Sequence, residues 1–188
     1  MKILALDCSC PEHGTWAWAE NGAVQRAETF PGKASIHLFT HLAAHRNLQS
    51  DILLVGVGPG SFNGIRVSIS CAMGMAAAWG SPVEAMRSTD ALAWKNREKN
   101  LLSIFTPGRK GEFFLTRYAE GKLTSSPTVH PLTTLENILP SCGYAISSHP
   151  IAGIENFTPP QAADLIHYYL ANGPEHLSLQ PIHPQQTA

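Results

Sequence analysis

The sequence has few charged residues. Asp, Glu, Lys and Arg make up only 14% of its 188 residues, against roughly a quarter in an average globular domain. The net charge is −1 and no block of basic residues occurs, so the sequence lacks the usual electrostatic signature of a nucleic-acid-binding chain. We therefore expect no direct contact with nucleic acid. Because a surface poor in charge is weakly protected against association, the composition favours a chain that lies against a partner protein.

Cysteines and long apolar runs are also scarce. The four cysteines, Cys8, Cys10, Cys71 and Cys142, form no C-x-x-C pair, which argues against a zinc framework and a dense disulfide scaffold. The apolar run before Asp7 is too short for a signal peptide, and no apolar run is long enough to cross a bilayer. These absences predict a cytoplasmic protein with reduced thiols and no membrane contact.

What is present is a regular alternation of short strands and helices. The predicted strands cover residues 2–7, 15–19, 23–30, 51–57, 101–105 and 112–118. The predicted helices cover residues 36–47, capped by Ser35, and residues 62–79, 88–96, 132–139 and 160–171. Residues 173–188 are rich in Pro, Gln and His and are expected to be extended or frayed. This order predicts an α/β fold of two lobes, residues 1–99 and a reduced second lobe of residues 100–188.

A glycine-rich turn, Gly58-Pro-Gly-Ser-Phe-Asn-Gly64, joins a fully apolar strand to the helix at residues 62–79. Such a turn directs backbone N–H groups and a helix N-terminus at one point, which suits a phosphate. It lacks the Gly-Lys-Ser/Thr of a Walker loop and the glycine spacing of the dinucleotide fingerprint. A tight turn that binds nothing explains the local spacing equally well. The candidate phosphate-site residues are Asp7, Gly58, Gly60, Ser61 and Gly64.

The helix at residues 62–79 carries two stripes. Small residues recur every four positions, and an apolar stripe runs beside them. Small residues let another element approach a helix closely. One stripe must face the protein's own sheet, and the sequence leaves open which stripe covers a partner. The candidate interface residues are Gly64, Ile65, Ser68, Ile69, Ala72, Met73, Met75 and Ala76.

Three histidines, His37, His41 and His45, are spaced four apart, so one helix face could present all three. A metal-dependent hydrolase is one interpretation. However, Leu38 occupies the position of the general-base glutamate in the zinc-peptidase motif. A polar or interface stripe is therefore the favoured interpretation, and we expect no metal site.

Three segments resemble the TsaB family of tRNA-modification proteins. Leu4-Ala-Leu-Asp7-Cys-Ser9 is similar to that family's opening strand, LALDTS, and Gly58 through Val67 are similar to its signature GPGSFTG-L/I-R-I/V-G. Arg109-Lys-Gly-Glu112 resembles the segment DAR-x-x-E-V-Y, with Thr106-Pro107-Gly108 in place of Asp-Ala. Asn63 and Ser68 also depart from the pattern. The resemblance covers residues 1–95 well and the second lobe loosely.

The resemblance implies an actin/Hsp70/sugar-kinase-like (ASKHA) fold and a non-catalytic subunit. Such a subunit binds TsaD, the transferase that makes N6-threonylcarbamoyladenosine (t6A) in tRNA, and a TsaE-type ATPase joins the pair. It also implies that the subunit binds TsaD through first-lobe helices and that it can self-associate. No cofactor is expected, with ATP or ADP as the candidate if one binds. The alternatives left open are a small ATPase or phosphotransferase using Asp7 and Gly58–Gly64, the histidine-based hydrolase, and a homodimer of changed function.

Overall fold

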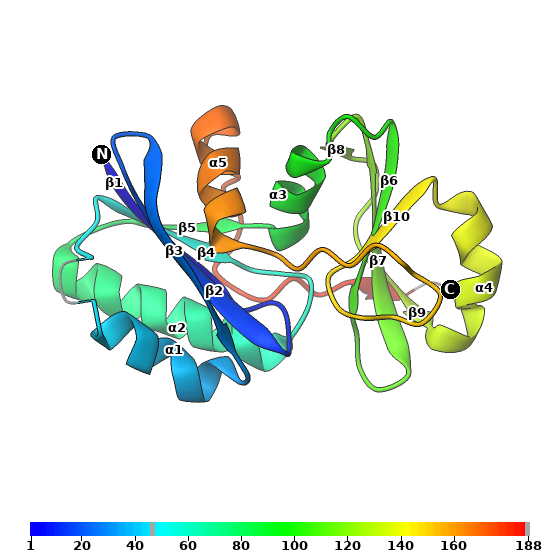
Figure 1. The fold of residues 1–188 in the computed structure, drawn as a ribbon, viewed down its shortest axis with the longest axis horizontal. Coiled ribbons are helices and arrows are strands. Elements are labelled where there is room, and N and C mark those ends of the chain that lie inside the picture. The colour runs from blue at the N-terminus through cyan, green and yellow to red at the C-terminus, as the bar shows by residue number, and fades with distance from the viewer. Residues whose placement is uncertain (46–47, 187–188) are drawn as a thin grey trace.

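The computed structural model describes residues 1–45 and 48–186 and shows two lobes, each built on a mixed β-sheet (Figure 1). In the first lobe the strands are, in spatial order, β3 (Ala23–Pro31), β2 (His13–Glu20), β1 (Lys2–Asp7), β4 (Ile52–Gly56) and β5 (Val83–Met86). The first three are antiparallel, whereas β4 is parallel to both of its neighbours. The predicted central position of β4 is confirmed, as expected for a strand that is apolar on both faces.

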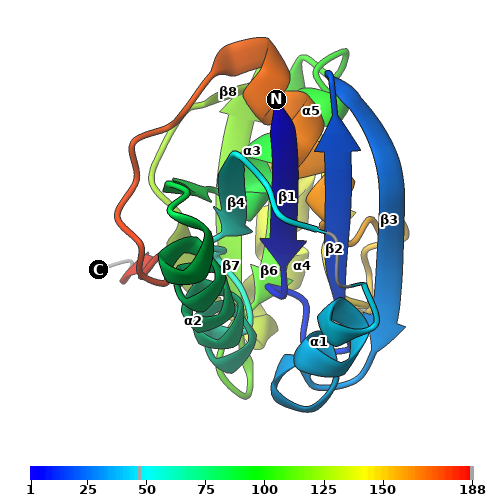
Figure 2. The same ribbon diagram turned by 90° about the vertical axis from the view of Figure 1, so that its left-hand side faces the viewer.

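Helices cover both faces of this sheet. Helices α1 (Ala34–Ala43) and α2 (Phe62–Trp79) lie side by side on one face, and α5 (Ala162–Asn172) lies on the other (Figure 2). Alternation along β1 explains this, since Leu4 and Leu6 face α1 and α2 whereas Ile3 and Ala5 face α5. The bounds predicted for α2 are confirmed. Its ends are fixed locally by the Ser61 cap and by Gly80 in the left-handed conformation.

The second sheet forms the other lobe. Its strands are, in order, β10 (Tyr144–Ser147), β6 (Leu101–Pro107), β7 (Glu112–Ala119), β9 (Thr128–Pro131) and β11 (Gln185–Gln186), with β8 (Lys122–Leu123) paired to β7. Helix α3 (Ser88–Lys95) lies between the two sheets, and its residues Leu92 and Ala93 pack with Tyr118 of β7. The six predicted strands are all confirmed. Strands β5 and β8 to β11 were not predicted, because each has only two to four residues.

Residues 173–184, here called the strap, follow α5 and run from the first lobe to the second (Figure 1). Leu177 forms an isolated bridge with Ala85 at the edge of the first sheet. The backbone N–H of Ile182 donates to the carbonyl oxygen of Val57 over 2.9 Å. The chain then pairs as β11 with β9. The segment is thus extended, as predicted, and tied to both lobes.

Three sequence predictions need correction. Helix α1 begins at Ala34, so Ser35 lies within it and does not cap it. It ends at Ala43, and the predicted end at residue 47 lies outside the described residues. The helix predicted at 132–139 is only α4 (Leu135–Ile138), flanked by two short 3-10 turns, because Pro140 follows closely.

Helix α5 belongs with the first sheet although it follows the second one in the chain. Leu165 and Ile166 are fully buried against β1 and β4, and the N–H of Ala162 donates to Oγ1 of Thr15 over 2.9 Å. A division at residue 99 has β1 to β5 on one side and β6 to β11 on the other, but it parts α5 from the core that it completes. In the described part of the chain, no helix has both the length and the apolar character needed to span a bilayer.

Candidate functional site

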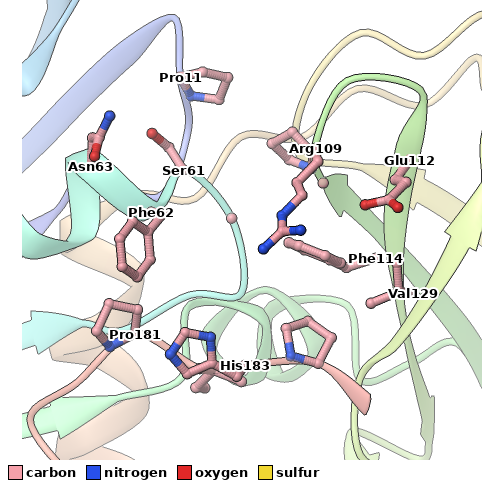
Figure 3. Close-up of a pocket in the computed structure, with 15 residues that line it drawn as sticks. Pro11, Ser61, Phe62, Asn63, Arg109, Glu112, Phe114, Val129, Pro181 and His183 are labelled. Carbon is pink, nitrogen blue, oxygen red and sulfur yellow. The ribbon is translucent and has the colours of Figure 1, made fainter. Parts of the chain in front are cut away.

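A cavity of about 570 Å³ lies between the lobes. Figure 3 shows the Arg109 side chain projecting into it from the β6–β7 turn, beside the ring of Phe114. Ser61 and Phe62, at the N-terminus of α2, face it from the first lobe, and His183 of the strap forms part of the floor in this view. The cavity therefore brings together the start of α2, the β6–β7 turn and the strap, which lie far apart in the sequence.

The turn between β4 and α2 is held against the loop that follows β1. The Ser61 N–H donates to the carbonyl oxygen of Ser9 over 2.7 Å, and the Ser61 hydroxyl accepts from the N–H of Gly64 over 3.4 Å. A β-carbon at Gly60 would collide with the same Ser9 carbonyl. The glycine at position 60 thus lets the turn close on this loop and present the start of α2 to the cavity.

Asp7 does not reach this cavity. Its side chain is 2% exposed, and its Oδ1 accepts hydrogen bonds from the N–H and hydroxyl of Ser9 over 2.9 and 2.6 Å. Its Oδ2 lies against Gly56, with the Ser88 hydroxyl close by. Burial raises the pKa of the Asp7 carboxyl, because desolvation disfavours the charged form. Asp7 is therefore a buried carboxyl beneath the glycine-rich turn.

The five candidate phosphate-site residues are thus divided. Gly60 and Ser61 line the cavity, whereas Asp7, Gly58 and Gly64 do not. Gly64 packs against the carbonyl group of Cys8. Phe114 and the strap also line the cavity. No sequence pattern indicated them, because pairing between strands that are remote in the sequence places them there.

The cavity lining favours a ligand with an anionic group and an apolar body. Arg109 supplies a guanidinium, and the aromatic rings of Phe62 and Phe114 supply apolar surface. Glu112 is the one carboxylate among the described residues that line it. A magnesium–phosphate complex is usually held through one or two carboxylates, and this lining offers one, Glu112.

The N-terminal part of both stripes of α2 faces inward. Gly64, Ile65, Ser68, Ile69 and Ala72 are all buried within the chain itself. Small residues let the helix lie close over β1 and β4, and Ile65 and Ile69 fill the space beside them. The small-residue stripe is therefore not a free docking surface. Of the predicted interface set, Met73 is exposed, and Met75 and Ala76 are half-buried.

The outer surface of α1 and α2 carries large apolar side chains that the protein itself leaves uncovered. Ile36 and Phe39 of α1 are 62% and 57% exposed, and Met73 of α2 is 53% exposed. The two helices lie side by side (Figure 2), so these residues belong to one helical layer. Large apolar side chains left exposed on one layer of helices are candidates for burial against a partner. We call Ile36, Phe39 and Met73 the helical face.

The three histidines do not share a helix face. His45 lies beyond the end of α1, contacts the Trp16 ring at a tilt and approaches Glu28 at 3.0 Å. His41 stacks on Phe30 and lies 3.7 Å from Glu28. Within the described residues no three His, Cys, Asp or Glu side chains gather as candidate metal ligands. The positions of His41 and His45 are therefore explained by ring contacts and by pairing with one glutamate.

Two mixed sheets with α-helices on both faces of the first, and a glycine-rich turn opening a helix at the interlobe cavity, define a protein of the ASKHA class. The family model "TsaD: tRNA N6-adenosine threonylcarbamoyltransferase" matches residues 41–141, more than half of the chain. The chain belongs to this family. The predicted resemblance to TsaB-type proteins is confirmed by this match together with the structural similarity to YeaZ, given next.

The fold is similar to that of YeaZ from Pseudomonas aeruginosa, with a TM-score of 0.73 and 21% identity over 97% of this chain and 99% of that one. A second structure, of an uncharacterized protein with similarity to the peptidase YeaZ, from the same organism, has a TM-score of 0.71 and 19% identity, covering 98% of this chain and 99% of that one. Identity at this level shows the fold alone.

Sequence relatives are found in mycobacteria. An uncharacterized protein of Mycobacterium leprae is 32% identical over 88 residues, which are 47% of this chain and 24% of the relative. An uncharacterized protein of Mycobacterium bovis is 30% identical over 100 residues, 53% of this chain and 45% of the relative. The chain thus matches less than half the length of these curated relatives.

Proposed function

We propose that the chain is a non-catalytic partner subunit in t6A modification of tRNA and that it binds a TsaD-type transferase subunit. Family membership and the YeaZ-like fold support a role in this system. The observation that carries the proposal is the helical face, where Ile36, Phe39 and Met73 leave more than half of each side chain in water. Burying an apolar side chain of this size contributes about 1.5–3 kcal/mol, so a partner that covers all three gains a substantial part of its affinity there.

The non-catalytic role is supported by the state of Asp7. Its carboxyl is buried, engaged by Ser9 and turned away from the cavity. Glu112 alone offers a carboxylate to the lining. An ASKHA-type ATPase or phosphotransferase is the second candidate, favoured by the Arg109-containing cavity. The two candidates differ in one measurement, because a site for ATP with Mg²⁺ raises the melting temperature as the nucleotide is added. We expect no rise.

The test of the proposal is co-purification with the TsaD-type subunit of the same organism, measured by size-exclusion chromatography with light scattering. Wild type is expected to form a stable heterodimer. Phe39→Arg, which places a charge on the helical face, is expected to abolish it. Leu101→Arg is the matched control, since Leu101 is 60% exposed on the second lobe. The control should assemble as wild type does.

Three results would count against the proposal. A lone homodimer that ignores the TsaD-type subunit would assign the helical face to a second copy of this chain. Equal assembly of wild type and Phe39→Arg would place the interface elsewhere. Loss of assembly in Leu101→Arg as well would show that the arginine acts through general instability. Binding of a TsaE-type ATPase is a separate proposal, tested by adding that subunit to the purified pair.

A further inference from the structure

The interlobe cavity contains a guanidinium that no acid neutralises. The Arg109 side chain is exposed and makes no ion pair or hydrogen bond with another described residue. Glu112 also lines the cavity. Figure 3, however, shows the Arg109 guanidinium directed away from the Glu112 carboxylate and toward the side of the cavity that Phe62 forms. Arg109 is therefore free to bind an anion that enters the cavity.

The opposite wall of the cavity offers backbone donors at the start of α2. The Ser61 N–H donates to the carbonyl oxygen of Ser9, and the Gly64 N–H donates to the Ser61 hydroxyl. Between them, the N–H groups of Phe62 and Asn63 have no acceptor within the described residues. The first turn of this 18-residue helix carries no acidic side chain. The positive end of the helix dipole is thus uncompensated on the wall that faces Arg109.

The rest of the lining suits a flat apolar group. The rings of Phe62 and Phe114 come from different lobes and both line the cavity. The Phe62 ring is held by two neighbours, with the His183 ring 6.0 Å away between centroids and the Arg66 guanidinium carbon 5.3 Å from the Phe62 centroid. Aromatic rings held in this way favour stacking with another flat ring. The remaining apolar side chains of the lining are Pro11, Pro107, Val129, Pro181, Ile182 and Pro184.

The charges of the lining favour a ligand with a single negative charge. Arg109 and the start of α2 attract an anion, whereas Glu112 repels any further negative charge. A nucleoside triphosphate brings several negative charges, which bound magnesium and a P-loop lysine commonly offset. No lysine lines this cavity. A carboxylate has one charge, and its two oxygens match the fork of a guanidinium.

We propose that the interlobe cavity binds, without a metal ion, a small monocarboxylate with a flat apolar body. The carboxylate lies between Arg109 and the N–H groups at the start of α2, and the apolar body lies against Phe62 and Phe114. The cavity volume of about 570 Å³ is in the usual range for small-molecule sites. The site is separate from the proposed TsaD-type interface, because no residue of the helical face lines it.

Isothermal titration calorimetry in magnesium-free buffer tests the proposal with naphthalene-2-carboxylate as the probe. Its neutral isostere, naphthalene-2-carboxamide, is the matched ligand control. Wild type is expected to bind the carboxylate with a Kd of about 1 mM or tighter. It should bind the carboxamide at least about tenfold more weakly, because hydrogen bonds to a charged group are the stronger ones.

Three variants separate the contributions of charge and ring. Arg109→Gln is expected to weaken carboxylate binding at least about tenfold and to reduce the preference over the carboxamide to below about threefold. Lys110→Gln is the matched control, since Lys110 is exposed in the same turn and does not line this cavity. It should bind as wild type does. Phe62→Ala should weaken both ligands by a similar factor. Thermal melts check that each variant is folded.

Four results would overturn the proposal. The first is no binding of the carboxylate at millimolar concentration. The second is equal binding of carboxylate and carboxamide by wild type. The third is equal loss of binding in Arg109→Gln and Lys110→Gln, which would assign the effect to the general charge of the turn. The fourth is a lower Kd for AMP or for ATP with Mg²⁺ than for the carboxylate, which would make the cavity a nucleotide site.

Discussion

Gly64, in the first turn of α2, lies directly on the carbonyl oxygen of Cys8 at the end of β1, with no room for a side chain between them. The neighbour is backbone, which cannot rotate away. Gly64→Ala is therefore expected to lower the free energy of unfolding by about 1–3 kcal/mol through overpacking. Denaturant unfolding followed by circular dichroism measures this loss.

Gly74 in the same helix provides the opposite expectation. A β-carbon at this position meets nothing within 4 Å, and alanine favours the helix over glycine. Gly74→Ala should raise the free energy of unfolding by about 0.5–1 kcal/mol. If the two substitutions have equal effects, the close contact between α2 and β1 is not what selects glycine at position 64.

Ala72 and Met73 are adjacent in sequence but lie in opposite environments, one fully buried and the other 53% exposed. Ala72→Arg forces a charge into the core and is expected to cost more than about 4 kcal/mol, so the protein should fail to fold. Met73→Arg should change stability by less than about 0.5 kcal/mol while weakening binding to the proposed partner. Thermal melts and co-purification separate the two effects. A folded Ala72→Arg variant would show that α2 is rotated from this position.

Tyr118 connects the second sheet to α3 through its hydroxyl, which donates to Asp90 and lies 2.7 Å from the Thr89 hydroxyl. Tyr118→Phe leaves a buried carboxylate oxygen without this donor and should lower the free energy of unfolding by about 1–3 kcal/mol. Tyr144→Phe is the control, since Tyr144 is 36% exposed. Comparable losses in both variants would argue against a special role for the buried hydroxyl.

The four cysteines are buried free thiols. Burial raises the pKa of the Cys10 thiol to about 12 and that of Cys71 to about 11, and it raises the pKa of Cys8 further. Thiolates are the reactive form, so native protein at pH 8 should react slowly with a disulfide reagent. All four thiols should react at once in denaturant. Fast labelling of native protein would show that a thiol-bearing segment opens readily.

Local signals explain what the sequence could predict. Helix α2 was placed correctly because Ser61 and Gly80 fix its ends by contacts within a few residues. Strand β4 was placed correctly because a fully apolar run requires burial on both faces. The resemblance to TsaB proteins likewise depended on contiguous segments, at residues 4–9 and 58–67.

Long-range packing determines the features that local sequence signals could not predict. Both stripes of α2 are apolar or small, so periodicity could not show that the N-terminal part of each faces the sheet while Met73 of the apolar stripe is exposed. The strap meets the cavity because β11 pairs with β9, and neither is long enough to be recognised from its residues. The hydrogen bond from the Arg87 N–H to Glu175 joins positions separated by most of the second lobe, and no spacing rule links them.

The late position of α5 has a consequence for synthesis on the ribosome. The face of β1 and β4 that carries Ile3 and Leu54 is covered by Leu165 and Ile166, which emerge only after nearly the whole second sheet has been made. Apart from β11, the strands of the second lobe are contiguous in the chain. That lobe can therefore fold while one face of the first sheet is still uncovered. A nascent chain that stalls between β10 and α5 therefore exposes an apolar sheet surface that is prone to aggregation. Such a chain depends on a chaperone or on resumed elongation to avoid aggregating.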